Sequence, residues 1–410
     1  MKYQIPKMYA SIVNMCLLGL IVNYIIVAFE KKNKQMEIIK DLNKENCFMK
    51  KLLVLTLSVV MTLLVFAGCG KASSSNTASS TSETFDSSKP YTGKFVNGKL
   101  TKPFHLKMPT PTGFTEGIIA DQKGFFKEVG IIPEYTGVLP ANVSLAQSVI
   151  KGDNDLFGSG HLTTIAAIRA AGAKIKVVLT GSVDSPEFDK THMTWFVKAG
   201  SNIKSAKDLV GKKIAMSSKG SCAELWNAEF LRQNGVDVSK TQIVVMNDQQ
   251  QEQALRQGNI DVAIVHAPYN MKAKNNGGLN ILTTSYGIAA GAGNGQLSGV
   301  GCRAFSEDFI KKYPDVVKAY IVADVKAQQY VDNHYEESLQ IAAKVLKVDV
   351  KDTSGSLYAE NQKWVIPEQV DFWIKIAEKN KLTGFETPGK VKASDLYTND
   401  LNPYKNGEIK

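Results

Sequence analysis

Two stretches of the chain repeat one pattern of short apolar runs, polar loops and amphipathic helices at an offset of about 106 residues. The first begins FHLKMPTPTGFTEGIIADQKGFFKEVGI and continues with LAQSVIKGDNDLFGSGH. The second begins KKIAMSSKGSCAELWNAEFLRQNGV and continues with QEQALRQGNIDVAIVHAPY. Two glycines and an aspartate recur in register: Gly130 with Gly235, Gly152 with Gly258, and Asp155 with Asp261. The folded part is therefore expected to contain two similar units.

Each repeated glycine follows an amphipathic helix, so we expect it to take the left-handed conformation that ends a helix. The β-rich runs Leu156–Phe157 and Val262–Val265 follow the second glycine of each copy. Each copy then reads strand, polar loop, helix, strand, helix, strand. Such alternation predicts an α/β class with mainly parallel strands and helices on both sheet faces, arranged as two lobes. The alternative, that any two βα units look alike, is disfavoured by the matched glycines and aspartates.

In parallel sheets, ligands bind beyond the carboxyl ends of the strands, where helix N-termini point. The loops at those places, 110–115 and 159–161 in one copy and 217–222 and 266–269 in the other, are mostly rich in hydroxyls and glycine. Such loops suit an anion, although their serines and threonines can also serve only as helix caps. The candidate ligand-binding residues are Thr112, Gly113, Phe114, Thr115, Ser159, Gly160, His161, Ser218, Ser221, Cys222, His266 and Tyr269.

The spacing of Ser221 and Glu224, S-x-x-E, predicts a capping box that starts a helix at the third of these loops. Cys222 and His266 in facing loops suggest a thiol–imidazole pair, but no third group that would orient them stands out in the sequence. We therefore expect no catalytic residues.

Other reactive side chains are assigned structural or exposed positions. We expect this for His105, His192 and His334, and for Arg303 at a sheet end. The four tryptophans are expected in cores, with one of them able to wall the pocket. Cys302 and Cys222 are expected to be free thiols, and no His/Cys spacing indicates a metal site or a cofactor.

Residues 49–68 have the order of parts of a bacterial lipoprotein signal peptide. Two lysines precede residues 52–66, a run without charge that is shorter than the ~20 residues needed to span a bilayer. The sequence FAGC that ends at Cys69 resembles a lipobox, whose cysteine takes a diacylglycerol and becomes the mature N-terminus. Residues 69–103, which begin rich in serine and threonine, are expected to be a flexible tether. An ordinary membrane anchor is the alternative.

We interpret residues 1–48 as an untranslated upstream extension, with Met49 as the start. Codons for Lys44 and Glu45 can read AAGGAG, a ribosome-binding sequence, a short distance before Met49. The alternative is a transmembrane helix over the apolar residues 9–29. Without residues 1–68, the net charge falls from +10 to about +5, and no basic run alternates with aromatics. This composition disfavours nucleic-acid binding.

Four motifs occur in order along the chain: GIIADQKGFFKEVGI, SVIKGDNDLFGSG, IKSAKDLVGKKIAM and ALRQGNIDVAIVHAPY. Together they resemble motifs of the substrate-binding proteins of nitrate/sulfonate/taurine-type ABC importers, over about residues 105–375. The resemblance implies a type II periplasmic-binding-protein fold, with two lobes joined by a hinge. It implies a first lobe of residues 104–190 and 290–410 and a second of residues 191–289. The chain departs at His266, near which family members often have an acidic residue or tryptophan, so the ligand class does not follow from the resemblance.

The resemblance implies a lipid-anchored solute-binding component of an ABC importer, on the extracytoplasmic face of the cell membrane. Its partners would be a small-molecule ligand, a permease with its ATPase, and the membrane through the lipid anchor; we expect a monomer. The expected ligand is a small anionic organic solute of the sulfonate, taurine or nitrate kind. Three alternatives stay open: binding of a thiamine-pyrimidine-like heteroaromatic, an enzyme on this fold, and a sensor.

Overall fold

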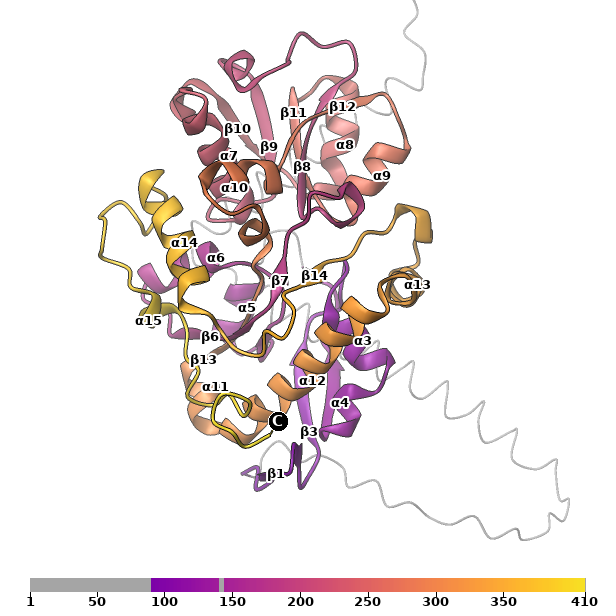
Figure 1. The fold of residues 1–410 in the computed structure, drawn as a ribbon, viewed down its shortest axis with the longest axis vertical. Helices are drawn as coiled ribbons and strands as arrows, with labels where there is room; N and C mark the ends of the chain where they lie inside the picture. The colour runs from indigo at the N-terminus through magenta and orange to yellow at the C-terminus, as the bar shows by residue number, and fades with distance from the viewer. Residues whose placement is uncertain (1–89, 140–143, 410) are drawn as a thin grey trace, which may run out of the picture. The chain divides into compact units, whose positions relative to one another are not determined.

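The structure, a computed structural model, describes residues 90–139 and 144–409 (Figure 1). The predicted upstream extension, signal peptide, lipidation at Cys69 and most of the tether lie outside the described residues. None of the helices in the described part is both long and apolar enough to cross a membrane.

One lobe is built on two small sheets. A parallel pair joins β3 (Phe104–Met108) to β4 (Ile131–Tyr135). An antiparallel sheet has the order β5-β13-β6, and its strands are β5 (Leu156–Phe157), β6 (Ile175–Thr180) and β13 (Cys302–Ser306). A short hairpin, β1 (Phe95–Val96) and β2 (Lys99–Leu100), precedes them.

The helices of this lobe come from both ends of the described chain. They are α3 (Glu116–Gln122), α4 (Phe125–Glu128), α5 (Leu145–Lys151), α6 (Leu162–Ala170), α11 (Glu307–Lys312), α12 (Pro314–Asn333) and α13 (Tyr335–Leu346). Helix α12 starts with a proline, which is favoured in a first turn because it has no N–H to leave unpaired. Its apolar face packs on α3 and α4.

The other lobe contains one five-stranded sheet of order β10-β9-β11-β8-β12. Its strands are β8 (Met193–Lys198), β9 (Lys213–Met216), β10 (Gln242–Val245), β11 (Val262–His266) and β12 (Leu279–Thr284). Its helices are α7 (Cys222–Gln233), α8 (Asp248–Gln257), α9 (Tyr269–Asn275) and α10 (Ser285–Ala292). Strand β8 runs antiparallel to both of its neighbours, so this sheet is mixed. Strand β13 is likewise antiparallel to both of its neighbours in the first lobe, so the prediction of mainly parallel strands is wrong.

The repeated residues have the same local roles in both lobes. All four repeated glycines have positive φ, between 70° and 81°, as predicted for residues that end helices. The two aspartates also match: Asp155 exchanges hydrogen bonds with the backbone of Lys107, and Asp261 does the same with Lys213. In each lobe this aspartate therefore ties the start of one strand to the strand beside it.

The lobes are joined by segments that cross between them. Strand β7 (Ser182–Val183) pairs with β14 (Leu357–Tyr358), and the chain then continues to β8. Helix α14 (Pro367–Lys379) contacts α6 of one lobe and α7 of the other, and α15 (Ala393–Leu396) also packs on α6. Trp373 on α14 lies edge-on to Trp226 on α7, with ring centroids 5.4 Å apart. The C-terminal part therefore packs against both lobes.

Three of the four tryptophans lie in cores, as predicted: Trp195, Trp226 and Trp373 are 0–1% exposed. Trp364 is only half-buried. Cys222 and Cys302 are free and buried, which confirms the expectation of free thiols.

Candidate functional site

A cleft of about 510 Å³ lies between the two lobes. It is lined by the loop after β3, the loop between β5 and α6, the N-terminus of α7 and the loop after β11. Eleven of the twelve candidate residues line it: Thr112, Gly113, Phe114, Thr115, Ser159, Gly160, His161, Ser221, Cys222, His266 and Tyr269. Ser218 is not among the lining residues; its carbonyl accepts a hydrogen bond from the Ser221 hydroxyl.

The start of α7 is where the sequence predicts it, but the capping box is wrong. Ser221 is the N-cap residue, yet its hydroxyl donates to the Ser218 carbonyl (2.6 Å) and makes no cap bond. The Glu224 carboxylate instead accepts from the backbone N–H of Gly220 (2.6 Å). The backbone N–H groups at this helix start are therefore not covered by the Ser221 side chain.

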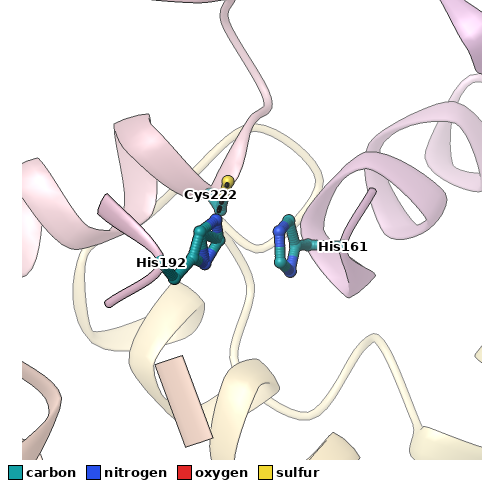
Figure 2. Close-up of side chains that lie close together, drawn as sticks. All are labelled: His161, His192 and Cys222. Atoms are coloured by element: carbon teal, nitrogen blue, oxygen red, sulfur yellow. Dashed lines mark hydrogen bonds between the residues drawn. The ribbon is translucent and has the colours of Figure 1, made fainter. Parts of the chain in front are cut away.

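Three histidines and a cysteine converge in the cleft. The ring of His161 stacks on that of His192, with centroids 4.4 Å apart and an angle of 18°. The ring of His266 lies 5.2 Å from that of His192. The Cys222 sulfur lies 3.2 Å from His266 Nε2 and 3.9 Å from His192 Nε2. We call His161, His192, Cys222 and His266 the His–Cys cluster; Figure 2 shows three of its members.

His266 is oriented by a carboxylate from helix α8. Its Nδ1 donates to Asp248 Oδ2 at 2.8 Å, while its Nε2 faces the Cys222 sulfur. The three residues thus form a thiol–imidazole–carboxylate series, the arrangement that activates a cysteine nucleophile. The expectation that the Cys222–His266 pair has no third, orienting group is wrong: Asp248 supplies it. Eighteen residues of chain separate Asp248 from His266, so only the packing of α8 beside β11 brings them together.

The other two histidines are held through the same ring nitrogen. His161 Nδ1 is hydrogen-bonded to the Val300 carbonyl (2.8 Å), and His192 Nδ1 to the Ser298 carbonyl (3.4 Å). A carbonyl oxygen only accepts, so in both rings Nδ1 carries a proton. Nε2 is therefore the ring nitrogen that remains for a second partner in the cleft, and the Cys222 sulfur lies 3.9 Å from Nε2 of His192.

The electrostatics of the cluster are strongly perturbed. Burial raises the pKa of the Cys222 thiol, but His161 and His266 more than offset this and lower it to about 6. Burial lowers the pKa of His266, yet Asp248 and Cys222 raise it well above its usual value. Burial, with the neighbouring His161 and His266, holds the pKa of His192 well below the usual value. At neutral pH the cluster therefore contains a thiolate beside a protonated His266.

His192 is the cluster member that sequence reasoning missed, since it was assigned a structural or exposed position. Its backbone N–H donates to the buried Asp184 (2.8 Å), which also accepts from the hydroxyls of Ser285 and Ser298. Asp184 thus joins the segment before β8 to segments that follow β12. The position of His192, directly before a strand that enters the second lobe, is the signal that pointed to the cleft.

The cationic side chains that line the cleft are already paired. Arg303 lies between Glu116 and Asp324, both buried, and its Nε donates to Glu116 at 2.5 Å. This agrees with the structural role predicted for it. Lys190 is bonded to Glu187 at 2.6 Å. The cleft therefore offers hydroxyls, backbone N–H groups and imidazoles rather than an uncompensated cation.

The two rims of the cleft touch. The Tyr269 hydroxyl, from the second lobe, donates to the Thr112 carbonyl of the first (2.9 Å), and Phe114 packs partly against the core of the first lobe. The described lobes are thus in direct contact around the cleft.

Comparisons with solved structures show what this architecture is. The alkanesulfonate-binding protein SsuA from Xanthomonas axonopodis pv. citri is 17% identical with a TM-score of 0.59, and the match covers 72% of this chain and 99% of that one. The periplasmic nitrate-binding protein NrtA from Synechocystis PCC 6803 is 15% identical with a TM-score of 0.56, and the match covers 76% of this chain and 89% of that one. The desulfurization enzyme DSZB is 14% identical with a TM-score of 0.50, and the match covers 75% of this chain and 99% of that one. The chain therefore has the two-lobed α/β fold of periplasmic binding proteins, as predicted.

Residues 112–338 match the family described as NMT1/THI5 like, and the chain belongs to that family. The resemblance to nitrate- and sulfonate-type binding proteins seen in the motifs is confirmed. No curated protein matches the chain in sequence.

Proposed function

We propose that this chain is the solute-binding component of an ABC importer and that its solute binds in the cleft between the lobes. The observation that carries the proposal is the cleft, of about 510 Å³, to which loops from both lobes contribute. A solute touching both lobes gains all its contacts only when they are closed, so it favours the closed form by its differential affinity. In this proposal the lobes comprise residues 104–190 with 290–410, and 191–289, and move about a hinge.

The solute is a small anion with a compact organic part, such as a sulfonate. The cleft provides donors of the kind that bind a spread oxyanion, namely the hydroxyls of Thr112, Thr115 and Ser159 and the helix start at Ser221. Phe114 and Tyr269 provide apolar surface for the organic part. Since Arg303 is already paired, recognition relies on neutral donors and on the His–Cys cluster.

We also propose that translation starts at Met49 and that the mature chain is anchored through lipidated Cys69, on the extracytoplasmic face. The order of charge, apolar run, lipobox and polar tether supports this. The intact mass of the membrane-extracted protein tests it. A chain that still carries residues 1–48 would overturn this part of the proposal without touching the cleft.

Paired substitutions at the start of α7 test the cleft. Ser221 lines it and Ser218 does not, so Ser221→Asp places a carboxylate at the anion while Ser218→Asp is the matched control. After native mass spectrometry has identified the co-purifying solute, Ser221→Asp should weaken its binding on the order of a hundredfold. Ser218→Asp should stay within about threefold. Equal affinities of a folded Ser221→Asp protein and wild type would refute the site.

The importer role is tested in cells and by scattering. Deletion of the gene should abolish uptake of the identified solute, and addition of the solute to the purified protein should reduce its radius of gyration. Unchanged uptake in the deletion strain would refute the importer role even if the solute binds.

A second candidate, a thiol-dependent enzyme, is favoured by the Cys222–His266–Asp248 series alone. In that case the purified protein should turn over its co-purifying compound steadily, and both Cys222→Ala and Asp248→Asn should abolish turnover. Binding without turnover in wild type would leave the solute-binding proposal as the better account.

A further inference from the structure

We propose that the cleft holds a divalent transition-metal ion of the zinc type, bound by His161, His192 and Cys222 (Figure 2). Each residue offers one ligand atom, and these atoms all lie within 4.8 Å of one another. The site is independent of the importer role, because metal binding is a property of the chain alone.

The distances suit the ion. Zinc bonds of about 2.0–2.3 Å in a tetrahedron place neighbouring ligand atoms about 3.3–3.6 Å apart. The sulfur and His192 Nε2 are separated by 3.9 Å already, and no pair in the set exceeds 4.8 Å. Side-chain shifts of about 1 Å would therefore complete the site.

Each histidine also has the supporting contact that metal-binding histidines have. The Nδ1 atoms of His161 and His192 are bonded to the carbonyls of Val300 and Ser298, which makes Nε2 the ring nitrogen that a second partner can contact. Figure 2 shows the two rings side by side with the Cys222 sulfur close to them. An imidazole whose Nδ1–H is bonded to a carbonyl is a better electron donor at Nε2, so these two hydrogen bonds favour a metal cation at Nε2.

The three ligand atoms converge on one another in the cleft. The Cys222 sulfur lies 3.9 Å from His192 Nε2, and its other neighbour is His266 Nε2 at 3.2 Å. Over residues 90–139 and 144–409, no side chain outside the His–Cys cluster is hydrogen-bonded to Nε2 of His161 or of His192. A metal ion at this point would bind the sulfur and both imidazoles at once.

The ligands are also held in place beforehand. His161 is sandwiched between His192 and Trp373, whose ring centroid lies 5.3 Å away at an angle of 6°. The backbone of His192 is fixed by Asp184, and Cys222 is the first residue of α7. Little rotamer freedom would then be lost on binding.

Two nitrogen ligands and one thiolate select a borderline-soft ion such as Zn²⁺ over Mg²⁺ or Ca²⁺, which prefer oxygen. Three protein ligands leave a fourth position open on a tetrahedral ion, and His266 is hydrogen-bonded to the sulfur ligand. A bound cation would also add positive charge to a cleft in which Arg303 and Lys190 are paired. It would thus give an anionic solute the counter-charge that the side chains lack.

The test is metal titration of the purified chain, freed of metal by a chelator. Zn²⁺ should bind with 1:1 stoichiometry in competition with a chromogenic chelator, and Co²⁺ should give a thiolate-to-cobalt charge-transfer band and tetrahedral ligand-field absorption. Cys222→Ser should abolish the charge-transfer band and weaken Zn²⁺ binding at least a hundredfold. His192→Ala should weaken binding at least tenfold.

The chain supplies matched controls. Cys302→Ser removes the other free buried thiol, and His334→Gln removes a histidine that stacks on Tyr330 away from the cluster. Both should bind Zn²⁺ as wild type does. A folded wild type that takes up no Zn²⁺, or a Cys222→Ser protein that binds as wild type does, would overturn the metal site. Neither result would bear on solute uptake in cells, which tests the importer role separately.

Discussion

The Arg303 network and the His–Cys cluster both reach the cleft, and they differ in how their polar atoms are paired. Arg303 is held between Glu116 and Asp324, and the hydroxyls of Tyr358 and Tyr320 donate to these carboxylates at 2.7 Å. All five side chains are buried. In the His–Cys cluster, by contrast, the Cys222 sulfur and the ring nitrogens contact one another where they line the cleft. A fully buried network of opposite charges stabilises a fold, whereas titratable groups that converge at a cleft are available to a ligand.

The sharpest way to break the comparison is Arg303→Leu. Glu116 would be left buried without its cation, and we expect the free energy of unfolding to fall by about 3–5 kcal/mol in denaturant titrations. The control is Lys326→Met. Lys326 pairs with Glu128, and both side chains are about half exposed, so we expect the free energy of unfolding to fall by about 1 kcal/mol or less. Similar losses in both variants would show that the Arg303 network is not a stabilising unit.

A free cysteine lies in each region: Cys222 in the His–Cys cluster and Cys302 beside Arg303. The pKa of Cys222 is lowered to about 6, whereas burial raises that of Cys302, beside Arg303, to about 12. At pH 7 Cys222 is mostly thiolate, so iodoacetamide should modify it at least about a hundredfold faster than Cys302 in the metal-free protein. Mass spectrometry of time points measures the two rates. Faster labelling of Cys302 would contradict this assignment of the thiolate.

Asp324→Asn sharpens the comparison through pH. Burial, followed by the nearby Glu116, raises the pKa of Asp324 to about 7, against an ordinary value of 3.8, although Arg303 opposes this. Between these values the folded protein holds a proton that the unfolded chain releases, so stability falls as pH rises. Asp324 should contribute a loss of about 2 kcal/mol between pH 5 and pH 7, which Asp324→Asn removes. Unfolding titrations at several pH values measure the difference; parallel profiles would contradict it.

The smallest expected effect is at the rim. Tyr269→Phe removes the hydrogen bond from the second lobe to the Thr112 carbonyl. The closed form should lose about 1 kcal/mol, and the solution radius of gyration without solute should rise slightly. Phe114→Leu is a control that leaves this bond intact. No change in Tyr269→Phe would mean that the rims close by other contacts.

Much of the fold could be predicted from the sequence because it depends on local rules. A glycine at a helix end needs a positive φ, which Gly130 and Gly235 both have. The repeated Asp155 and Asp261 make equivalent backbone bonds in the two lobes. Strand, loop and helix follow the period of apolar residues, and eleven of the twelve candidate residues line the cleft because their loops follow strand ends.

The chemistry of the site was decided only by the tertiary structure. His192 and Asp248 belong to no motif of the sequence, and they act through Cys222 and His266, which lie 30 and 18 residues away along the chain. Ser221 likewise has the capping-box spacing, but its hydroxyl bonds to the Ser218 carbonyl instead. Periodicity reports which face of an element is buried, whereas a pKa, a hydrogen-bond partner or a ligand set depends on which atoms of distant segments meet. The sequence alone determined the two lobes and their loops, and packing determined which imidazoles face the thiol.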